Sequence, residues 1–248
     1  MHPKRIIVGI TGASGAPYAK RLLERLAQAE CEIHLVASAL GRRLMADECG
    51  IKRLDADELT GGRGAQLTIH NENDPGGPVA SGSFRHDGMI IVPCSGNTMS
   101  KVAYGLTDNQ LQRAAMVTLK ERRRLILAHR ETPLSLVEIE AMRAATLAGA
   151  IILPLSPGFY LNPTSMDDLV DFMVARMLDL LGVPHEIQPT WDEHLAAERE
   201  ARLPVEREAR QPVDAIRAAA FAQFAERGYP VVTVRDIMKA CEIGRAHV

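Results

Sequence analysis

The sequence has few cysteines, and their arrangement would neither fix a fold nor hold a metal. Its 248 residues include four cysteines, Cys31, Cys49, Cys94 and Cys241, with eight histidines scattered along the chain. No two cysteines show the paired spacing of a zinc site or of a disulfide framework. We therefore expect reduced thiols and no metal, and we expect Cys94 to be a small buried thiol without a chemical role.

The chain also lacks long apolar segments and an excess of charge of one sign. Its longest apolar runs, such as 89–92 and 148–153, are far shorter than the ~20 residues that span a bilayer. The N-terminus has no apolar region typical of a signal peptide. Lysine and arginine number 29 against 31 acidic residues, so no global field attracts nucleic acid or an anionic membrane. We expect a soluble, cytoplasmic protein that binds neither and whose anion sites are local.

What the chain does contain is an alternation of two periodicities. Short β-rich runs, expected to be strands buried on both faces, cover 5–10, 32–37, 89–93, 124–129 and 150–153. Amphipathic helices are expected between them at 17–29, 38–49, 109–121 and 135–147. This alternation is typical of an α/β fold, Rossmann-like and three-layered, with a parallel sheet. Ser135 and Glu138 predict a capping box, and the less regular stretch 50–84 predicts a surface insertion with a loop at 71–78.

Polar or conformationally special residues follow the expected strands. Parallel strands place their carboxyl ends at one edge of the sheet, where helix N-termini and loops converge on ligands. The turn 11–16 opens a helix with N–H groups and a hydroxyl that could hold a phosphate, although its glycines could equally serve chain geometry. The other strands are followed by Ser38, which could merely cap its helix, and by 93–98, 130–134 and 154–160. Together these segments indicate one long ligand cleft.

Cations also occur on an expected helix at 109–121. Arg113 and Lys120 are seven residues apart, about 10 Å along one helix face, so their flexible ends could converge on one anion. They could equally form a solvated stripe. The three arginines at 122–124 are expected to be solvated, because cations suit the C-terminus of a helix.

Arg176 presents a different problem. It follows Leu169, Phe172 and Met173 at the spacing i, i+3, i+4, i+7, which predicts a buried arginine within an apolar helix stripe. A buried charge needs a partner. That partner could be Asp179, another subunit or a phosphate ligand.

These motifs occur together in an order that identifies a family. TGASG, ASGSF, VPCSGNT, LKERR, LILAHRETPL and PGFY resemble, in this order, the motifs of flavin prenyltransferases of the UbiX type. The resemblance covers residues 4 to about 191. It implies a metal-independent prenyltransferase that joins a dimethylallyl group from dimethylallyl phosphate to reduced FMN. It also implies a homododecamer with FMN at a subunit junction, and a UbiD-type decarboxylase that receives the prenylated FMN.

The resemblance implies roles for individual residues. Its flavin contacts fall on Gly12, Ala13, Ser14, Ser38, Ser95, Gly96, Asn97, Thr98 and Arg130. Its prenyl-phosphate contacts fall on Arg113, Lys120, Tyr160 and Arg176, with Glu131 beside them; these five are the expected catalytic residues. Cations aimed at the leaving phosphate would stabilise the charge that develops there, Glu131 would assist proton transfer, and Tyr160 would orient the phosphate. Phe84 is expected to wall the prenyl group, and Trp191 could do likewise.

A related class offers an alternative function. FMN-dependent decarboxylases of cysteinyl peptides or of phosphopantothenoylcysteine use a similar fold with a catalytic histidine and an asparagine loop. His70 and Asn97 are the candidates here. That class gives no reason for LKERR followed by RETPL, so prenyl transfer is the favoured interpretation.

Residues 1–191 are expected to form the enzyme domain, and 192–248 a separate extension. Residues 214–241 resemble the opening helices of a TetR-type regulator, but the chain ends before a recognition helix, so no working DNA-binding module is expected. The last six residues, IGRAHV, can be back-translated to ATCGGAAGAGCACACGTC, which matches a common sequencing adapter. We hypothesise that the extension is artefactual or non-functional.

Overall fold

A computed structural model describes residues 2–74 and 76–187, together with 214, 216–218, 220–222 and 225. The chain divides into two compact units, Met1–Gln188 and Pro189–Val248. The fold and the site described below belong to the first unit. Trp191, Cys241 and the terminal hexapeptide lie outside the described residues, as does most of the extension.

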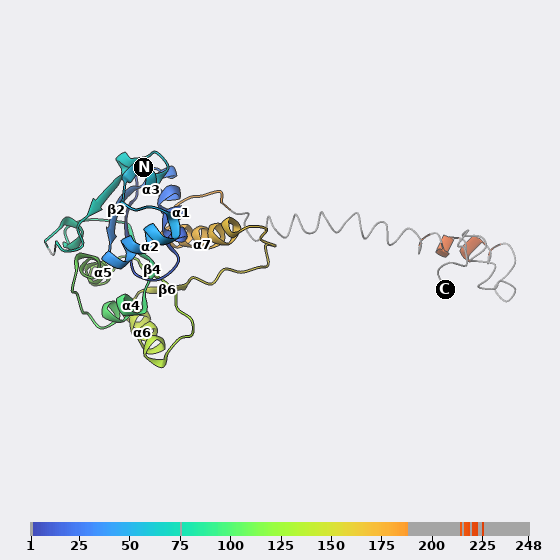
Figure 1. Ribbon diagram of the computed structural model, residues 1–248. Helices are drawn as coiled ribbons and strands as arrows, with labels where there is room; N and C mark the ends of the chain where they lie inside the picture. Colours follow the sequence, from blue (N-terminus) through green and yellow to red (C-terminus); the bar gives the residue numbers. More distant parts are fainter. Residues whose placement is uncertain are drawn as a thin grey trace. The chain divides into compact units, whose positions relative to one another are not determined.

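A six-stranded parallel sheet forms the centre of the first unit (Figure 1). The strands are β1 (Arg5–Ile10), β2 (Glu32–Ala37), β3 (Leu67–His70), β4 (Gly88–Cys94), β5 (Leu125–His129) and β6 (Ile151–Pro154). They lie in the order β3-β2-β1-β4-β5-β6. The order reverses direction between β1 and β4, and in such sheets this point opens a crevice at the carboxyl edge. The predicted α/β fold with a parallel sheet is confirmed.

Helices cover both faces of the sheet (Figure 1). They are α1 (Ala16–Gln28), α2 (Ala39–Cys49), α3 (Ala56–Thr60), α4 (Gly96–Ala103), α5 (Gln110–Lys120), α6 (Leu136–Leu147) and α7 (Met166–Leu181). Successive strand residues point to opposite faces, so Ile6 and Val8 pack with α1, α2, α3 and α7, whereas Ile7 packs with α4, α5 and α6. Two apolar cores therefore sandwich the sheet, as expected for a three-layer fold.

Four helices begin at serine caps that the sequence makes recognisable. The side chains of Ser38, Ser95, Ser135 and Ser165 accept hydrogen bonds from backbone N–H groups of the first turn of α2, α4, α6 and α7. The predicted capping box of Ser135 and Glu138 is confirmed. Two of these caps, Ser38 and Ser95, follow strands directly, which places the N-termini of α2 and α4 at the carboxyl edge.

Two expectations about the strands were incomplete or wrong. The stretch 50–84 contains β3 and α3, which the irregular composition of this stretch concealed. The strand at 150–153 is not buried on both faces: in β6 the residues Ile151, Ile152 and Leu153 are only partly buried and Pro154 is exposed. β6 is the last strand in the sheet order and, among the described residues, pairs only with β5, so no other described segment covers part of its surface.

Candidate active site

The turn after β1 and the loop after β4 are hydrogen-bonded to each other. The Thr11 hydroxyl donates to the Pro93 carbonyl oxygen at 2.7 Å and accepts from the Ser95 backbone N–H at 2.9 Å. Thr11 is buried, so both bonds are shielded from water. This link holds the segment 12–14 beside 95–98, and two groups of predicted flavin contacts therefore lie together.

Arg130 ties the loop after β5 to the same place. Its Nε donates to the Ser14 carbonyl oxygen at 3.2 Å, and its backbone N–H donates to the Cys94 carbonyl oxygen at 3.3 Å. A guanidinium carries five N–H donors, and the bond to Ser14 uses one of them. Glu131, the next residue, is exposed at this edge. The structure thus brings Ser14 to the loop of Arg130 and Glu131, although Ser14 and Arg130 lie 116 residues apart.

Glu48 occupies part of the turn that was expected to hold a phosphate. Its Oε2 accepts hydrogen bonds from the backbone N–H groups of Gly15 and Ala16, each at 2.8 Å. Those two N–H groups at the start of α1 are therefore already paired with an anion, which corrects the expectation that they are free. Sequence reasoning missed Glu48 because it lies at the end of α2, and only the packing of α2 brings it to this turn.

Ser38 and Gly12 are set by the approach of α2 to the turn. The Ser38 side chain accepts from the Gly41 N–H at 3.0 Å, so its capping role is present. A Cβ added at Gly12 would lie 2.6 Å from the Cβ of Leu40, closer than atoms tolerate. For Gly12, chain geometry alone therefore demands glycine, and a role in flavin binding must come from its backbone.

Cys94 lies between these loops and is fully buried. Burial raises the pKa of its thiol far above the ordinary value, because the thiolate would lose its hydration. The expectation of a small buried thiol is confirmed.

Among the described residues Cys31 and Cys49 are also free thiols. No group of three histidine, cysteine or acidic side chains in the described part of the chain could hold a metal ion.

Arg113 and Lys120 line one cavity on the outer side of α5. This cavity has a volume of about 290 Å³ and is bounded by Gly76, Gly77, Ala80, Ser81, Gly82, Arg113, Val117 and Lys120. The Lys120 Nζ also pairs with Glu121 Oε1 at 2.6 Å. Both side chains are exposed, so a solvated stripe and convergence on one anion remain the two interpretations of these cations.

The segment opposite α5 is held by Arg123, which corrects the expectation of three solvated arginines. Arg123 is half-buried, and its Nη1 and Nη2 donate to the carbonyl oxygens of Phe84 and Gly82 at 2.7 and 2.8 Å. A planar guanidinium can reach two carbonyls at once, whereas a hydrated surface cation would reach neither. Arg122 and Arg124 are exposed, as expected.

Tyr160 and Arg176 lie over one face of α7. The Tyr160 ring packs edge-on against Phe172, with ring centroids 5.7 Å apart. Phe172 and Arg176 are four residues apart and therefore neighbours on the helix surface. Arg176 is not buried, because 57% of its side chain is exposed, and its Nη1 lies 3.0 Å from Asp179 Oδ2. The prediction of burial was wrong, and of the partners considered it is Asp179 that the structure shows.

Phe84 lies away from the flavin group within the single chain. It packs edge-on against His34, with centroids 4.8 Å apart, and the Arg5 guanidinium lies 5.0 Å from its centroid. Arg5 begins β1, and Phe84 itself precedes β4, so Phe84 lies toward the amino ends of the strands. His70, the histidine considered for a decarboxylase, has its Nε2 2.9 Å from His34 Nδ1.

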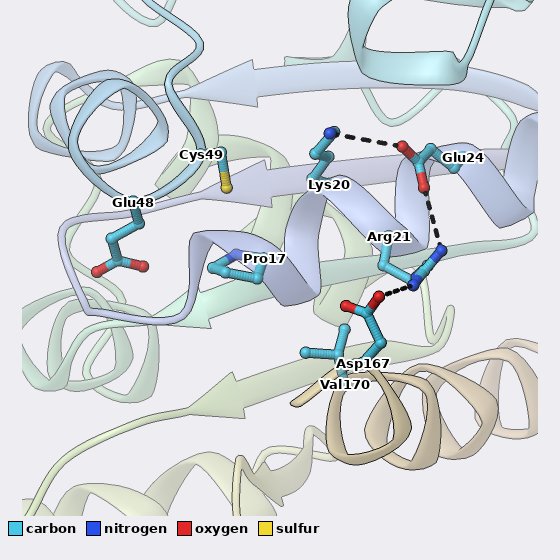
Figure 2. Close-up of a pocket in the computed structure, with 8 residues that line it drawn as sticks. All are labelled: Pro17, Lys20, Arg21, Glu24, Glu48, Cys49, Asp167 and Val170. Atoms are coloured by element: carbon cyan, nitrogen blue, oxygen red, sulfur yellow. Dashed lines mark ion pairs between the residues drawn. The ribbon is translucent and has the colours of Figure 1, made fainter. Parts of the chain in front are cut away.

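A separate cavity of about 360 Å³ lies beside α1 and contains none of the predicted site residues. Figure 2 shows its lining: Pro17, Lys20, Arg21, Glu24, Glu48, Cys49, Asp167 and Val170. Arg21 reaches both Glu24 and Asp167, at 3.8 and 3.5 Å, and Lys20 lies 3.9 Å from Glu24. These charges pair with each other along α1 and, through Asp167, with α7, and the cavity is therefore distinct from the cationic cavity on α5.

Comparison with protein families gives two matches along the chain. The flavoprotein family model matches residues 1–178, and the model of bacterial regulatory proteins of the tetR family matches residues 216–248. No helix among the described residues is long and apolar enough to cross a membrane.

Curated relatives and solved structures agree with the first match. The chain is 43% identical over 205 residues to the flavin prenyltransferase UbiX of Pseudomonas aeruginosa, covering 79% of this chain and 98% of that one. It is 44% identical to UbiX of Deinococcus radiodurans, covering 73% and 90%. A solved structure of AnUbiX (PadA1) in complex with FMN and dimethylallyl pyrophosphate superposes with a TM-score of 0.70 at 40% identity, covering 77% and 98%.

Two further structures separate family from fold. A dodecameric FMN-dependent UbiX-like decarboxylase from Escherichia coli O157:H7 has a TM-score of 0.68 at 39% identity, covering 75% of this chain and 98% of that one. The cypemycin decarboxylase CypD has a TM-score of 0.52 at only 16% identity, covering 73% and 95%, which shows a shared fold alone. On these motifs, this architecture and these identities, the chain belongs to the flavin prenyltransferase family of flavoproteins.

Proposed function

We propose that this enzyme joins the dimethylallyl group of dimethylallyl phosphate to reduced FMN and releases prenylated FMN. The observation that carries the proposal is the shared cavity of Arg113 and Lys120, two cations on one helix face beside a loop of small residues. A prenyl monophosphate ionises readily only when its leaving phosphate is neutralised, and paired cations supply that neutralisation without a metal. Solved relatives support the ligand class, since AnUbiX was solved with FMN and dimethylallyl pyrophosphate.

The carboxyl edge fits a flavin mononucleotide. A flavin phosphate requires hydroxyls, backbone N–H groups and a cation, and a flat ring requires small residues beside it. Ser38, Ser95 and Thr98 provide hydroxyls at the N-termini of α2 and α4, and the Arg130 guanidinium lies against Ser14. We propose that Gly12, Ala13, Ser14, Ser38, Ser95, Gly96, Asn97, Thr98 and Arg130 hold FMN.

Reduced FMN supplies a nucleophilic N5 and a ring carbon, C6, to which the two ends of the prenyl group become attached. The chain's own residues bind and orient the other reactant. Arg113, Lys120 and Arg176 hold the phosphate and stabilise its charge as it leaves, and the Tyr160 hydroxyl orients it. Phe84 shields the prenyl group from water. Glu131 moves a proton to or from the phosphate or the flavin.

The distribution of these residues favours a site completed by several subunits. In one chain the flavin residues lie at the carboxyl edge, Arg113 and Lys120 lie outside α5, and Tyr160 and Arg176 lie on α7. A homododecamer would let neighbouring copies bring these groups together. The dodecameric Escherichia coli relative supports this arrangement. We propose further that residues 1–191 form the complete enzyme, that it works in the cytoplasm, and that a UbiD-type decarboxylase receives the product.

The Glu131→Gln variant tests the reaction assignment. Incubated with reduced FMN and dimethylallyl phosphate, it should form prenylated flavin at least tenfold more slowly than the unchanged protein, as read by mass spectrometry, while binding FMN normally. Glu140→Gln is a matched control, because Glu140 is an exposed carboxylate on α6. An unchanged rate in Glu131→Gln would remove Glu131 from the mechanism. If the unchanged protein formed no prenylated flavin, the result would instead favour an FMN-dependent decarboxylase of cysteinyl peptides or of phosphopantothenoylcysteine.

A further inference from the structure

Asp179 joins Arg176 to a second, well-packed residue. One carboxylate oxygen, Oδ2, lies 3.0 Å from Arg176 Nη1, and the other, Oδ1, lies 3.2 Å from His185 Nε2. The His185 Nδ1 accepts from the Ile187 backbone N–H at 3.4 Å, so the neutral ring carries its proton on Nε2 and donates it to Asp179. Each carboxylate oxygen therefore has one partner.

His185 anchors this chain of contacts. Only 14% of its side chain is exposed, compared with 50% for Asp179 and 57% for Arg176. It follows α7 and lines a cavity against α1 with Arg25 and Pro184. Exposure rises from His185 outward to Arg176, so the most exposed member, a long arginine, is linked through Asp179 to the least exposed one.

Helix stability does not account for Asp179. It lies in the last turn of α7, three residues before the Gly182 cap, where a negative charge is unfavourable with the helix dipole. Arg176 precedes Asp179, which is the less favourable order for an ion pair on a helix. An exposed pair of this kind contributes little to folding. The contact does direct the Arg176 guanidinium toward Asp179.

We propose that Asp179, held by His185, is a positioning residue that orients Arg176 toward the phosphate of the prenyl donor. This rests on the proposed function, in which Arg176 is a phosphate contact. Asp179 uses a single Nη1 donor, and the guanidinium has further N–H groups with which to hold phosphate oxygens. Tyr160, packed on Phe172 one turn earlier on α7, lies over the same helix face.

The opposite effect is a clear rival, because a carboxylate beside an arginine could simply compete with phosphate. The two ideas predict KM changes of opposite sign. If Asp179 positions Arg176, Asp179→Asn should raise the KM for dimethylallyl phosphate and lower kcat/KM about tenfold, since Arg176 both binds the phosphate and stabilises its charge as it leaves. If Asp179 only competes, the same variant should lower that KM, which would overturn the proposal.

Three further variants sharpen the test. Asp179→Glu keeps the charge and should recover part of the lost affinity for the donor. His185→Ala removes the anchor and should raise the KM in the same direction, by less. Glu186→Gln, an exposed carboxylate nearby, serves as the matched control and should leave the KM unchanged. The Kd for FMN and the thermal midpoint of each variant report whether folding is intact.

Arg176→Ala separates failure of this inference from failure of the proposed function. An unchanged KM in Arg176→Ala would remove Arg176 from the phosphate site and the inference with it. A raised KM in Arg176→Ala, with no rise in Asp179→Asn, would overturn only the role of Asp179. In the double variant, Asp179→Asn should add nothing to Arg176→Ala; additive effects would show that Asp179 acts by another route.

Discussion

At the scale of single residues, His86 shows how burial sets a titration. It lies just before β4 and is only 9% exposed. The Thr118 hydroxyl donates to the Ala114 carbonyl oxygen at 2.7 Å, so its oxygen is left to accept from His86 Nε2 at 3.3 Å. Burial, and then the nearby charge of Arg123, lowers the pKa of His86 to about 4. The folded protein therefore keeps this ring neutral at pH values where the unfolded chain protonates it.

This difference predicts an acid sensitivity of folding. Between the unfolded pKa, about 6.5, and the folded one, the unfolded chain binds more protons, so the free energy of unfolding falls as pH falls. From pH 7 to pH 5 the His86 contribution is about 2 kcal/mol. Urea unfolding at a fixed protein concentration should show the unchanged protein losing about this much more stability than His86→Gln.

The control for that measurement is His2→Gln, because His2 is exposed. It should follow the pH dependence of the unchanged protein. Equal losses in His86→Gln and in the unchanged protein would contradict a depressed pKa at His86.

At the scale of elements, the segment 78–84 depends on Arg123 more than on its own sequence. It contains only a short 3₁₀ turn at Pro78–Ala80 and a few local hydrogen bonds, such as Phe84 N–H to the Ser81 carbonyl at 3.1 Å. Two bonds from the Arg123 guanidinium close the segment against α5. Because this segment also walls the cavity of Arg113 and Lys120, its position matters to the proposed phosphate site.

Removing the two hydrogen bonds of Arg123, which act as a clamp on the segment 78–84, should loosen this segment without unfolding the domain. Hydrogen bonds to charged groups contribute on the order of 1.5–3 kcal/mol, so Arg123→Ala should speed amide exchange at Phe84 by at least about tenfold. Hydrogen–deuterium exchange measures this directly. Arg122→Ala, at an exposed neighbouring arginine, should leave the rate unchanged. Identical exchange in both variants would show that the clamp does not hold the segment.

At the scale of the whole molecule, assembly matters because one chain scatters the proposed catalytic residues. Exposed apolar side chains on α6 include Leu136, Val137 and Leu147, and β6 is only partly covered. Apolar surface of this kind is typical of an interface between protein chains. Contacts between subunits of the proposed homododecamer would cover both the apolar side chains of α6 and the partly exposed strand β6.

The extension is expected to be dispensable for this assembly. Light scattering of the full chain and of a chain ending at residue 191 should give twelve chains per particle in both cases, with equal Kd values for FMN. A smaller particle for the shortened chain would show that residues 192–248 contribute to the enzyme. A smaller particle for the full chain alone would show that they disturb it.

The class of fold and the family follow from local patterns in the amino-acid sequence. Apolar runs of strand length alternate with amphipathic helices along the chain. A parallel sheet with helices on both faces buries the apolar side chains of both kinds of element. A capping box such as that of Ser135 and Glu138 involves residues only three positions apart, so it could be recognised in the amino-acid sequence. The motifs around Arg130 and Tyr160 identified the family for the same reason, since each is a short continuous string.

The contacts between distant residues, in contrast, depend on how the elements pack. Glu48 reaches the turn after β1, Arg123 clamps Phe84 and Gly82, and Arg176 turns outward to Asp179. No periodicity encodes these contacts, because each depends on how two separately formed elements pack. Helical spacing put Arg176 in an apolar stripe, but a long side chain can carry its charge out of such a stripe to water and to a carboxylate. The local pattern sets which elements form, and packing sets what their side chains touch.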